Sequence, residues 1–482
     1  MEGTIMSSTK ERIHQIAEDK SAIIADMNQS LWGYAEYGYQ EFKSAKKLTD
    51  VLRAEGFEVE TGIAGIETAF VGTYGSGSPV IGILAEYDAL PNLSQEAGKT
   101  DRRPIEGQKY GHGCGHCALG SGAVGAALIV KEYLQETGKQ GTIKIFGCPA
   151  EETGFGKCFM VREHCFDGLD ICFSWHPMDT TRCFTRSAAY YKVRFDFKGK
   201  AAHAGRAPED GRSALDACEL MNVGVNYLRE HVISTARMHY AYLDCGGDAP
   251  NVVQETASLL YFVRSPRLKI CQDILERVKK VARGAAMMTE TEVDIKVLGG
   301  MSDYIPNPTA SQLLSDAFVE QGGPDFGEAE FAIAREFLAA MSDEDREKAL
   351  EAGSRVNGIS KEEFAARPMN TTVLPFCEKD RETMSTGSTD VGDVSYNIPT
   401  GQYRVAIGVP GITTHTWPFT AIVGTSIGDK ASQAVARGIA RACTMVYEDP
   451  SVTEKAKQEL LDETKGEYLS PLPEGAKPGE GM

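Results

Sequence analysis

The stretch VIGILAEYDALP, residues 80–91, decides the fold class of this chain. A short apolar run leads into acidic residues and a proline, which is typical of a buried parallel strand that carries polar side chains at its C-terminal end. GTIKIFGCPAEE at 141–152 and LDICFSWHP at 169–177 share this profile, and helical patterns separate the three. This alternation of strands and helices predicts an α/β sandwich with a mostly parallel sheet. In such sheets, ligands bind at the C-terminal ends of the strands.

The pattern changes after residue 187. AAYYKVRFDFKGK, residues 188–200, alternates apolar and polar side chains, as a strand with one face in water does. The elements up to residue 299 follow the order strand, helix, strand, strand, helix, strand. We therefore expect a ferredoxin-like α+β domain at 188–299, inserted into a discontinuous catalytic domain formed by 1–187 and 300–482.

Composition excludes some partners. The net charge of −18 argues against nucleic acid and anionic membranes, since phosphate binding needs clustered Lys and Arg. The N-terminus has no apolar run typical of a secretory signal, and no stretch approaches the length of a membrane span. The twelve cysteines are scattered, several within apolar runs, which favours reduced thiols in the cytoplasm over a disulfide framework.

Glycines alternate with metal-binding residue types in GHGCGHC, residues 111–117. Such glycines allow tight turns, so Cys114 and His116 can offer a thiolate and an imidazole to one Zn²⁺-like ion. The same pattern also fits a glycine-rich turn with an idle histidine and thiol. His112 and Cys117 compete for the same role.

Acids and histidines end the other predicted strands. Adjacent Glu151 and Glu152 can divide labour, one binding a metal and one handling protons, and a nearby dication makes the pair tolerable. Alone, the pair also suits the first turn of a helix. His176 ends the third strand, and His415 lies in TTHTWP at 413–418. Asp88 is a candidate to orient a ligand imidazole.

Several motifs occur in a fixed order: AEYDALP, GHGCGHC, PAEE, WHP, GKAAHAGRAPEDGRSALDA, GSTDVGDVS and TTHTW. In this order the chain resembles the aminoacylase and carboxypeptidase-G-type family of two-metal peptidases, in its amidohydrolase branch, over about residues 20–460. The resemblance implies a catalytic α/β domain, a smaller lid domain that also dimerises, and two divalent ions, Zn²⁺ or Mn²⁺.

The resemblance also assigns roles to individual residues. Glu151 matches the general base, and His203 matches the lid histidine that stabilises the oxyanion in the active site of the partner subunit. The five positions that match metal ligands are Cys114, His116, Glu152, His176 and His415.

Two residues of the expected lid match substrate-binding positions of the family, and one residue of the glycine-rich loop departs from the family pattern. Asn251 and Arg264 fall where the lid of the family contacts the substrate carboxylate. The residue after His116 is usually Asp or Asn in these relatives but is Cys117 here. A thiol is a weak hydrogen-bond partner, so the departure affects the expected metal more than the expected reaction.

The expected activity is hydrolysis of the amide bond of a small N-acyl amino acid such as aminobenzoyl-glutamate, by a homodimer or by a hetero-oligomer with a related subunit. A dipeptidase or aminoacylase acting on small dipeptides is the alternative. A metal-binding subunit without turnover is less favoured, because a pure binder has no use for Glu151 beside a metal site. The hypothesis of a thiol redox protein has little support, since only Cys114 and Cys117 show CxxC spacing.

Overall fold

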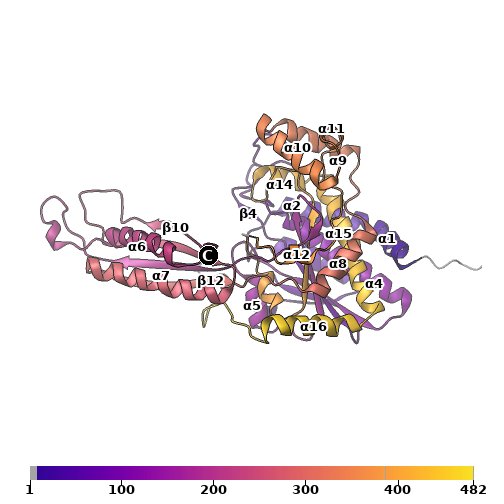
Figure 1. Cartoon of the computed structure of the whole chain (residues 1–482), viewed down its shortest axis with the longest axis horizontal. Helices are drawn as coiled ribbons and strands as arrows, with labels where there is room; N and C mark the ends of the chain where they lie inside the picture. Colours follow the sequence, from indigo (N-terminus) through magenta and orange to yellow (C-terminus); the bar gives the residue numbers. More distant parts are fainter. Residues whose placement is uncertain (1–7, 386, 481–482) are drawn as a thin grey trace, which may run out of the picture. The chain divides into compact units, whose positions relative to one another are not determined.

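The computed structural model describes residues 8–385 and 387–480 and divides the chain into two compact units (Figure 1). Unit 1 runs to Thr185 and continues over Ile305–Thr383 and Val394–Glu467. Unit 2 comprises Arg186–Tyr304, Met384–Asp393 and the chain from Tyr468.

Unit 1 is built on a seven-stranded sheet. The four strands β6, β3, β7 and β13 are parallel. Beyond β6, β2 pairs antiparallel with β6 and β1 pairs antiparallel with β2; beyond β13, β8 pairs antiparallel with β13. The three predicted parallel strands, β3, β6 and β7, are therefore confirmed. The sequence did not predict β2 or the fourth parallel strand, β13. In sheet order the strands are β1 (Glu58–Thr61), β2 (Phe70–Ser76), β6 (Gly141–Gly147), β3 (Val80–Ala85), β7 (Ile171–Met178), β13 (Thr400–Ala406) and β8 (Arg182–Cys183); β4 (Leu90–Pro91) and β5 (Tyr110–Gly111) form a separate pair.

Helices cover this sheet, and α4 and α15 pack closely against each other. Gly122 and Gly125 permit this packing, because a Cβ at Gly122 would lie 3.0 Å from Val435 and one at Gly125 would lie 3.0 Å from Ala436, both on α15. α4 is long and apolar enough to cross a membrane, but most of it is buried in the core. The helices are α1 (Thr9–Asp19), α2 (Ser21–Tyr34), α3 (Phe42–Ala54), α4 (His116–Thr137), α5 (Gly156–Arg162), α8 (Pro308–Gln321), α9 (Glu328–Ala339), α10 (Asp343–Asn357), α11 (Lys361–Ala366), α12 (Glu378–Arg381), α13 (Val391–Ser395), α14 (Trp417–Val423), α15 (Ser426–Glu448) and α16 (Ser451–Thr464).

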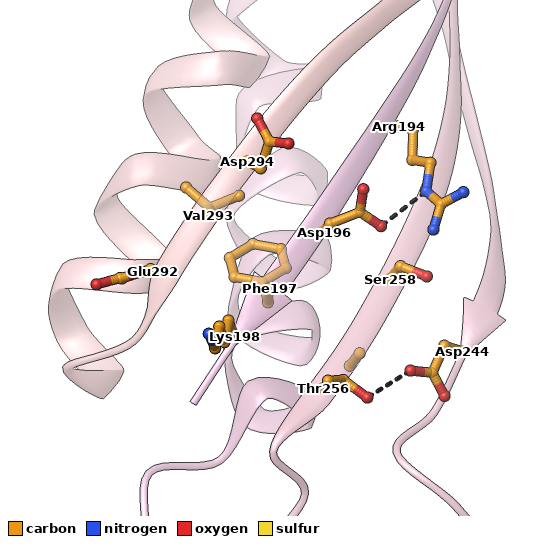
Figure 2. A pocket seen from close by; sticks show the side chains of 11 residues that line it. Arg194, Asp196, Phe197, Lys198, Asp244, Thr256, Ser258, Glu292, Val293 and Asp294 are labelled. Atoms are coloured by element: carbon orange, nitrogen blue, oxygen red, sulfur yellow. Dashed lines mark hydrogen bonds and ion pairs between the residues drawn. The ribbon is translucent and has the colours of Figure 1, made fainter. Parts of the chain in front are cut away.

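Unit 2 holds a four-stranded antiparallel sheet in the order β10, β11, β9, β12. Two helices pack on one face and share its apolar core. The other face carries charged side chains, among them Arg194 and Asp196, whose Nε and Oδ1 lie 2.7 Å apart (Figure 2). This is the predicted ferredoxin-like order, with β9 (Ala189–Lys198), α6 (Ala214–Leu228), β10 (Arg237–Asp244), β11 (Thr256–Ser265), α7 (Leu268–Thr289) and β12 (Glu292–Met301).

The unit boundaries differ from the expected 188–299. The second unit starts at Arg186, ends at Tyr304, and takes in two segments that the sequence assigned to the catalytic domain. Asp393 joins them, because its Oδ2 accepts the Ser302 N–H at 2.9 Å and its Oδ1 accepts the Tyr468 hydroxyl at 2.8 Å. Partners this far apart in sequence leave no periodic signal, which explains the difference.

Candidate active site

The C-terminal ends of the parallel strands place the predicted side chains on one edge of the sheet. Glu151 and Glu152 follow β6, and His176 lies within β7. His116 is the first residue of α4, after Gly115, whose positive φ of 79° suits glycine. His415 lies between β13 and α14, and its backbone N–H donates to the Gly113 carbonyl at 2.7 Å, so the glycine-rich loop holds the late histidine.

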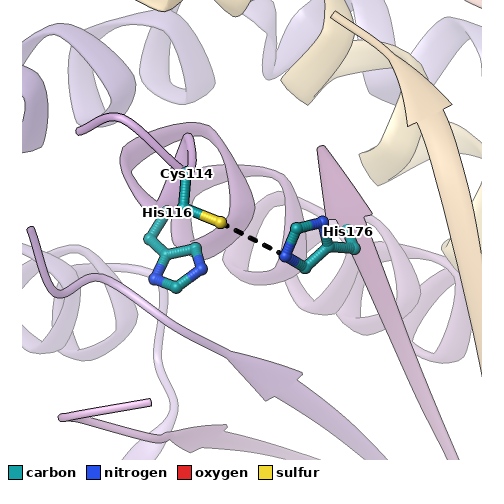
Figure 3. A group of neighbouring side chains, drawn as sticks. All are labelled: Cys114, His116 and His176. Carbon is teal, nitrogen blue, oxygen red and sulfur yellow. Dashed lines mark hydrogen bonds between the residues drawn. The ribbon is translucent and has the colours of Figure 1, made fainter. Parts of the chain in front are cut away.

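Three overlapping groups of metal-binding atoms lie at this edge. Within each group, one ligand atom of every member lies within 4.8 Å of the others. Cys114 belongs to two of these groups, and its Sγ lies 3.4 Å from His176 Nε2 (Figure 3). The groups are Cys114 with His116 and His176, Cys114 with Glu152 and His415, and Glu86 with His116 and Glu151.

The donor set fits divalent cations. His116 Nε2 is closed to solvent and makes no hydrogen bond within residues 8–385 and 387–480, and the equally enclosed Glu152 Oε1 lies 3.2 Å from His415 Nε2. Buried polar atoms without partners are costly unless an ion or water satisfies them. One thiolate, three imidazoles and a carboxylate are ligands that zinc-like ions accept. All five predicted ligands are thus brought together.

Burial and neighbouring charges shift the pKa values of these groups in different directions. Burial raises the pKa of the Cys114 thiol well above its ordinary value, and the Glu152 carboxylate adds to the shift. Burial lowers the pKa of His176 to about 4, which leaves a neutral imidazole with a lone pair for a metal. A nearby dication stabilises a thiolate, so metal binding would reverse the shift at Cys114.

Asp88 joins two parts of the site. Its Oδ1 lies 2.7 Å from His116 Nδ1, and its Oδ2 accepts the backbone N–H of Glu152 at 2.9 Å. The first contact leaves Nε2 of His116 to face Cys114 and Glu86. Asp88 therefore orients the imidazole and fixes the turn that carries the carboxylates, the role that its strand-end position predicted.

The sequence interpretation left Glu86 and Lys157 without roles. Both side chains are fully or almost fully buried, with Lys157 Nζ 2.7 Å from Glu86 Oε1. Glu86 Oε2 lies 3.4 Å from His116 Nε2, on the metal-facing side of the ring. Glu86 could have been found, because residues 86 and 88 of one extended segment point to the same side. Nothing in the sequence around Lys157 indicates its partner.

Glu41 is a second buried acid that the sequence did not single out. Its Oε1 accepts the Ala150 N–H at 2.8 Å, and its Oε2 accepts the Thr68 hydroxyl at 3.0 Å. Ala150 has a positive φ of 58°, an uncommon conformation for a residue with a side chain. Since Ala150 immediately precedes Glu151, Glu41 holds the strained turn that presents the two carboxylates.

The two competitors in the glycine-rich loop have structural roles. His112 is buried, its Nε2 lies 3.0 Å from the Leu31 carbonyl oxygen, and burial lowers its pKa to about 4. Cys117 lies in the core of unit 1, where burial raises the pKa of its thiol. Neither joins a metal-binding group among the described residues. Cys117 therefore adds no sulfur to these metal-binding groups.

Unit 2 carries the three remaining predicted residues. His203 is exposed and forms an isolated β-bridge with Val252, next to Asn251, whose carbonyl accepts the Ala204 N–H at 2.9 Å. Arg264 lies on β11, with its guanidinium over the Tyr190 ring at 5.0 Å. Their roles toward a substrate stay predictions.

A parallel-stranded unit with a cysteine, histidine and glutamate cluster at its strand ends defines a metal-dependent hydrolase. The sequence profile described as Peptidase family M20/M25/M40 matches residues 82–337. One of the subunits of p-aminobenzoyl-glutamate hydrolase from Escherichia coli (strain K12) is 38% identical over 459 residues, covering 94% of this chain and 95% of that protein. The chain belongs to peptidase family M20/M25/M40, and the predicted family is confirmed.

Two other proteins show the range of the similarity. Xaa-Arg dipeptidase of Mus musculus is 27% identical over 474 residues, covering 95% of this chain and 93% of its own. A crystal structure from Bacillus subtilis, described as a dinuclear metal binding peptidase from the M20 family, superposes with a TM-score of 0.57 at 17% identity, covering 89% of this chain and 99% of that one. At this identity the second comparison shows the fold alone, and it confirms the predicted architecture.

Proposed function

We propose that this chain hydrolyses the amide bond of an N-acyl amino acid, with aminobenzoyl-glutamate as the first substrate to test. The observation that carries the proposal is the position of Glu151, which shares a group with Glu86 and His116 beside the Cys114 groups. A carboxylate next to a metal-binding cluster is what general-base hydrolysis requires. The substrate follows from the relative that is 38% identical.

Glu151 supplies the proton transfers. Two divalent cations, Zn²⁺ or Mn²⁺, held by Cys114, His116, Glu152, His176 and His415, would acidify a water and polarise the amide carbonyl. Glu151 accepts the proton of the attacking water and returns it to the leaving amine, so that the C–N bond breaks with a neutral amine departing. Asp88 and Glu41 keep the two carboxylates and His116 in place during this exchange.

Metal identity follows from ligand chemistry. Thiolate and imidazole ligands favour Zn²⁺ on softness, whereas carboxylates also suit Mn²⁺. Elemental analysis of the purified protein decides between them.

The proposed location is the cytoplasm. Cysteines that the structure shows without disulfide bonds, such as Cys172 and Cys443, agree with such a reducing compartment.

His203 is proposed to complete the site of a second subunit by stabilising the oxyanion. Support for an assembly comes from unit 2, where exposed apolar residues occur on α6 and on the sheet edge next to it. Val223 and Tyr227, 52% and 77% exposed, share a face of α6, and Tyr240 on edge strand β10 is 43% exposed. Such a surface suits a homodimer or, since the 38% identical relative is itself one subunit of its enzyme, a pairing with a related chain.

The test of the base is Glu151→Gln, with Glu163→Gln as the matched control at an exposed site. We expect Glu151→Gln to keep its metal content but to lose about 10²–10⁴-fold in kcat on aminobenzoyl-glutamate. Glu163→Gln should behave as the unmodified protein. Full activity of Glu151→Gln, or a metal-loaded protein that cleaves no N-acyl amino acid and no dipeptide, would overturn the proposal.

The assembly is tested by mixing. His203→Ala and Glu151→Gln each abolish most activity if His203 acts across subunits. Mixed dimers then contain one intact site, and activity should partly return after subunit exchange. Exchange shown by a tagged subunit, without any return of activity, would exclude the role of His203 in the partner site.

A further inference from the structure

A pocket of about 540 Å³ opens in unit 1 beside His415. Three stretches far apart in the sequence form its walls: the loop near Leu93, the junction of α9 and α10, and the loop that carries His415. Phe337 on α9 and Asp345 on α10 line one side of the pocket, and the two helices lie together in Figure 1. The apolar lining consists mainly of Leu93, Phe337, Met341, Ile412 and Trp417.

The size and the lining favour a small aromatic group. Ligand pockets of roughly 300–1,000 Å³ with mostly apolar walls and a few polar groups are usual for small molecules. Trp417 and Phe337 offer ring surfaces, and aromatic rings pack well against each other in offset or edge-on arrangements. A planar ring therefore fits these walls better than a charged or strongly polar group does.

One carboxylate stands at the rim of this pocket. Asp345 lies in the first turn of α10, where its N–H donates to the Ser342 hydroxyl at 3.1 Å and its Oδ2 accepts from that hydroxyl at 2.7 Å. These bonds fix the side chain, and its Oδ1 accepts from no residue within 8–385 and 387–480. Asp345 can thus accept a hydrogen bond from a donor on the far side of a bound ring.

His415 links the pocket to the reacting bond. Its Nε2 lies 3.2 Å from Glu152 Oε1, and the same residue forms part of the pocket wall. An amide carbonyl placed at the metal-binding groups would therefore have one of its two substituents beside this opening.

We propose that the pocket binds the acyl half of the substrate and selects a benzoyl-type ring with a hydrogen-bond donor in the para position, which Asp345 accepts. This inference rests on the proposed hydrolysis of N-acyl amino acids and names which half of the substrate lies in the pocket. The α9–α10 junction, which supplies Phe337, Met341 and Asp345, then determines specificity.

The experiment compares kcat/KM for three acyl-glutamates: 4-aminobenzoyl, benzoyl and acetyl. Asp345→Asn should lower the preference for 4-aminobenzoyl over benzoyl about tenfold, whereas Asp343→Asn in the same helical turn should leave it unchanged. Ala340→Phe narrows the pocket and should reduce turnover of both aromatic substrates at least tenfold more than that of acetyl-glutamate. Calorimetry with 4-aminobenzoate and benzoate gives a second readout, in which Asp345→Asn removes the tighter binding of the amine.

The outcomes separate the two proposals. A metal-loaded wild-type protein that cleaves none of the three substrates, no other N-acyl amino acid and no dipeptide overturns the proposed function, and the acyl pocket falls with it. A wild-type protein that cleaves only N-acyl amino acids without an aromatic acyl group overturns the acyl pocket alone. A wild-type protein that cleaves them while Ala340→Phe reduces all three equally, or none, overturns the pocket alone. An unchanged amine preference in Asp345→Asn overturns the role of its carboxylate.

Discussion

Asp88 Oδ1 lies 2.7 Å from Nδ1 of His116, and both side chains are closed to solvent. The contact sets the ring so that Nε2 faces the other metal-binding atoms. Partners of this kind typically change metal affinity or activity by about 10–100-fold when removed. The same carboxylate also accepts the Glu152 N–H, so its loss affects two ligands at once.

The first prediction concerns this carboxylate. Asp88→Asn should weaken metal binding by about 10–100-fold, because an amide is a poorer partner for the imidazole and can present its NH₂ group to an N–H donor. Competition with a chelator, read by elemental analysis, measures the change. Asp101→Asn, at an exposed salt bridge with Arg103, is the control and should bind metal normally. Equal chelator resistance of Asp88→Asn and wild type would show that Asp88 does not orient a ligand.

The second prediction concerns the strained turn before the catalytic carboxylates. Glu41→Ala leaves the buried Ala150 N–H without its acceptor, which costs about 1–3 kcal/mol and lets the turn relax. We expect a lower kcat with nearly normal metal content. Glu41→Gln keeps one acceptor oxygen and should recover much of the loss. If the two variants have identical kcat and stability, the hydrogen bond does not support the turn.

The C-terminal ends of the buried strands could be predicted because the signal lies in residues that are adjacent in the sequence. An apolar run that ends in acids or a histidine marks the C-terminal end of a buried strand, and parallel strands bring such ends to one edge. Asp88, Glu151 and His176 were found in this way. The structure confirms that these strands are adjacent. His415 needed the family resemblance as well, because its loop follows no periodic pattern.

The missed features depend on tertiary contacts. Glu41 lies 109 positions from Ala150, and Lys157 on α5 reaches Glu86, which follows β3. Neither residue type nor spacing predicts such pairs. The acyl pocket likewise depends on tertiary contacts, because the contact of α9 and α10 with the His415 loop leaves no periodic signal in the sequence.

The third prediction is a pH dependence at α9. Burial would raise the pKa of Glu330, but hydrogen bonds from Lys430 and Ser426 outweigh it and hold the pKa below its usual 4.5. The ionised group therefore stabilises the fold above pH about 4.5, and this contribution disappears as the pH falls through the lowered pKa. Glu330→Gln should cost about 1–3 kcal/mol at pH 7 and progressively less below pH 4.5.

Urea denaturation at several pH values measures this difference. Glu328→Gln removes an exposed partner of Arg335 and serves as the control, with little expected effect at any pH. A gap between Glu330→Gln and wild type that stays constant from pH 7 to below pH 4 would contradict the proposed linkage.

The fourth prediction concerns the buried pair of Lys157 and Glu86. Lys157→Met leaves the Glu86 charge without its ammonium partner, and breaking a buried pair costs about 3–5 kcal/mol. Thermal and urea unfolding of the metal-free protein should show this loss, and added Zn²⁺ should reduce it because a cation near His116 also compensates Glu86.

Lys131→Met, at the more exposed pair with Glu132, is the control and should cost less than about 1 kcal/mol. The double variant Lys157→Met with Glu86→Gln removes the stranded charge and should regain stability. Failure of this rescue would mean that Lys157 stabilises the site by packing and not by its charge.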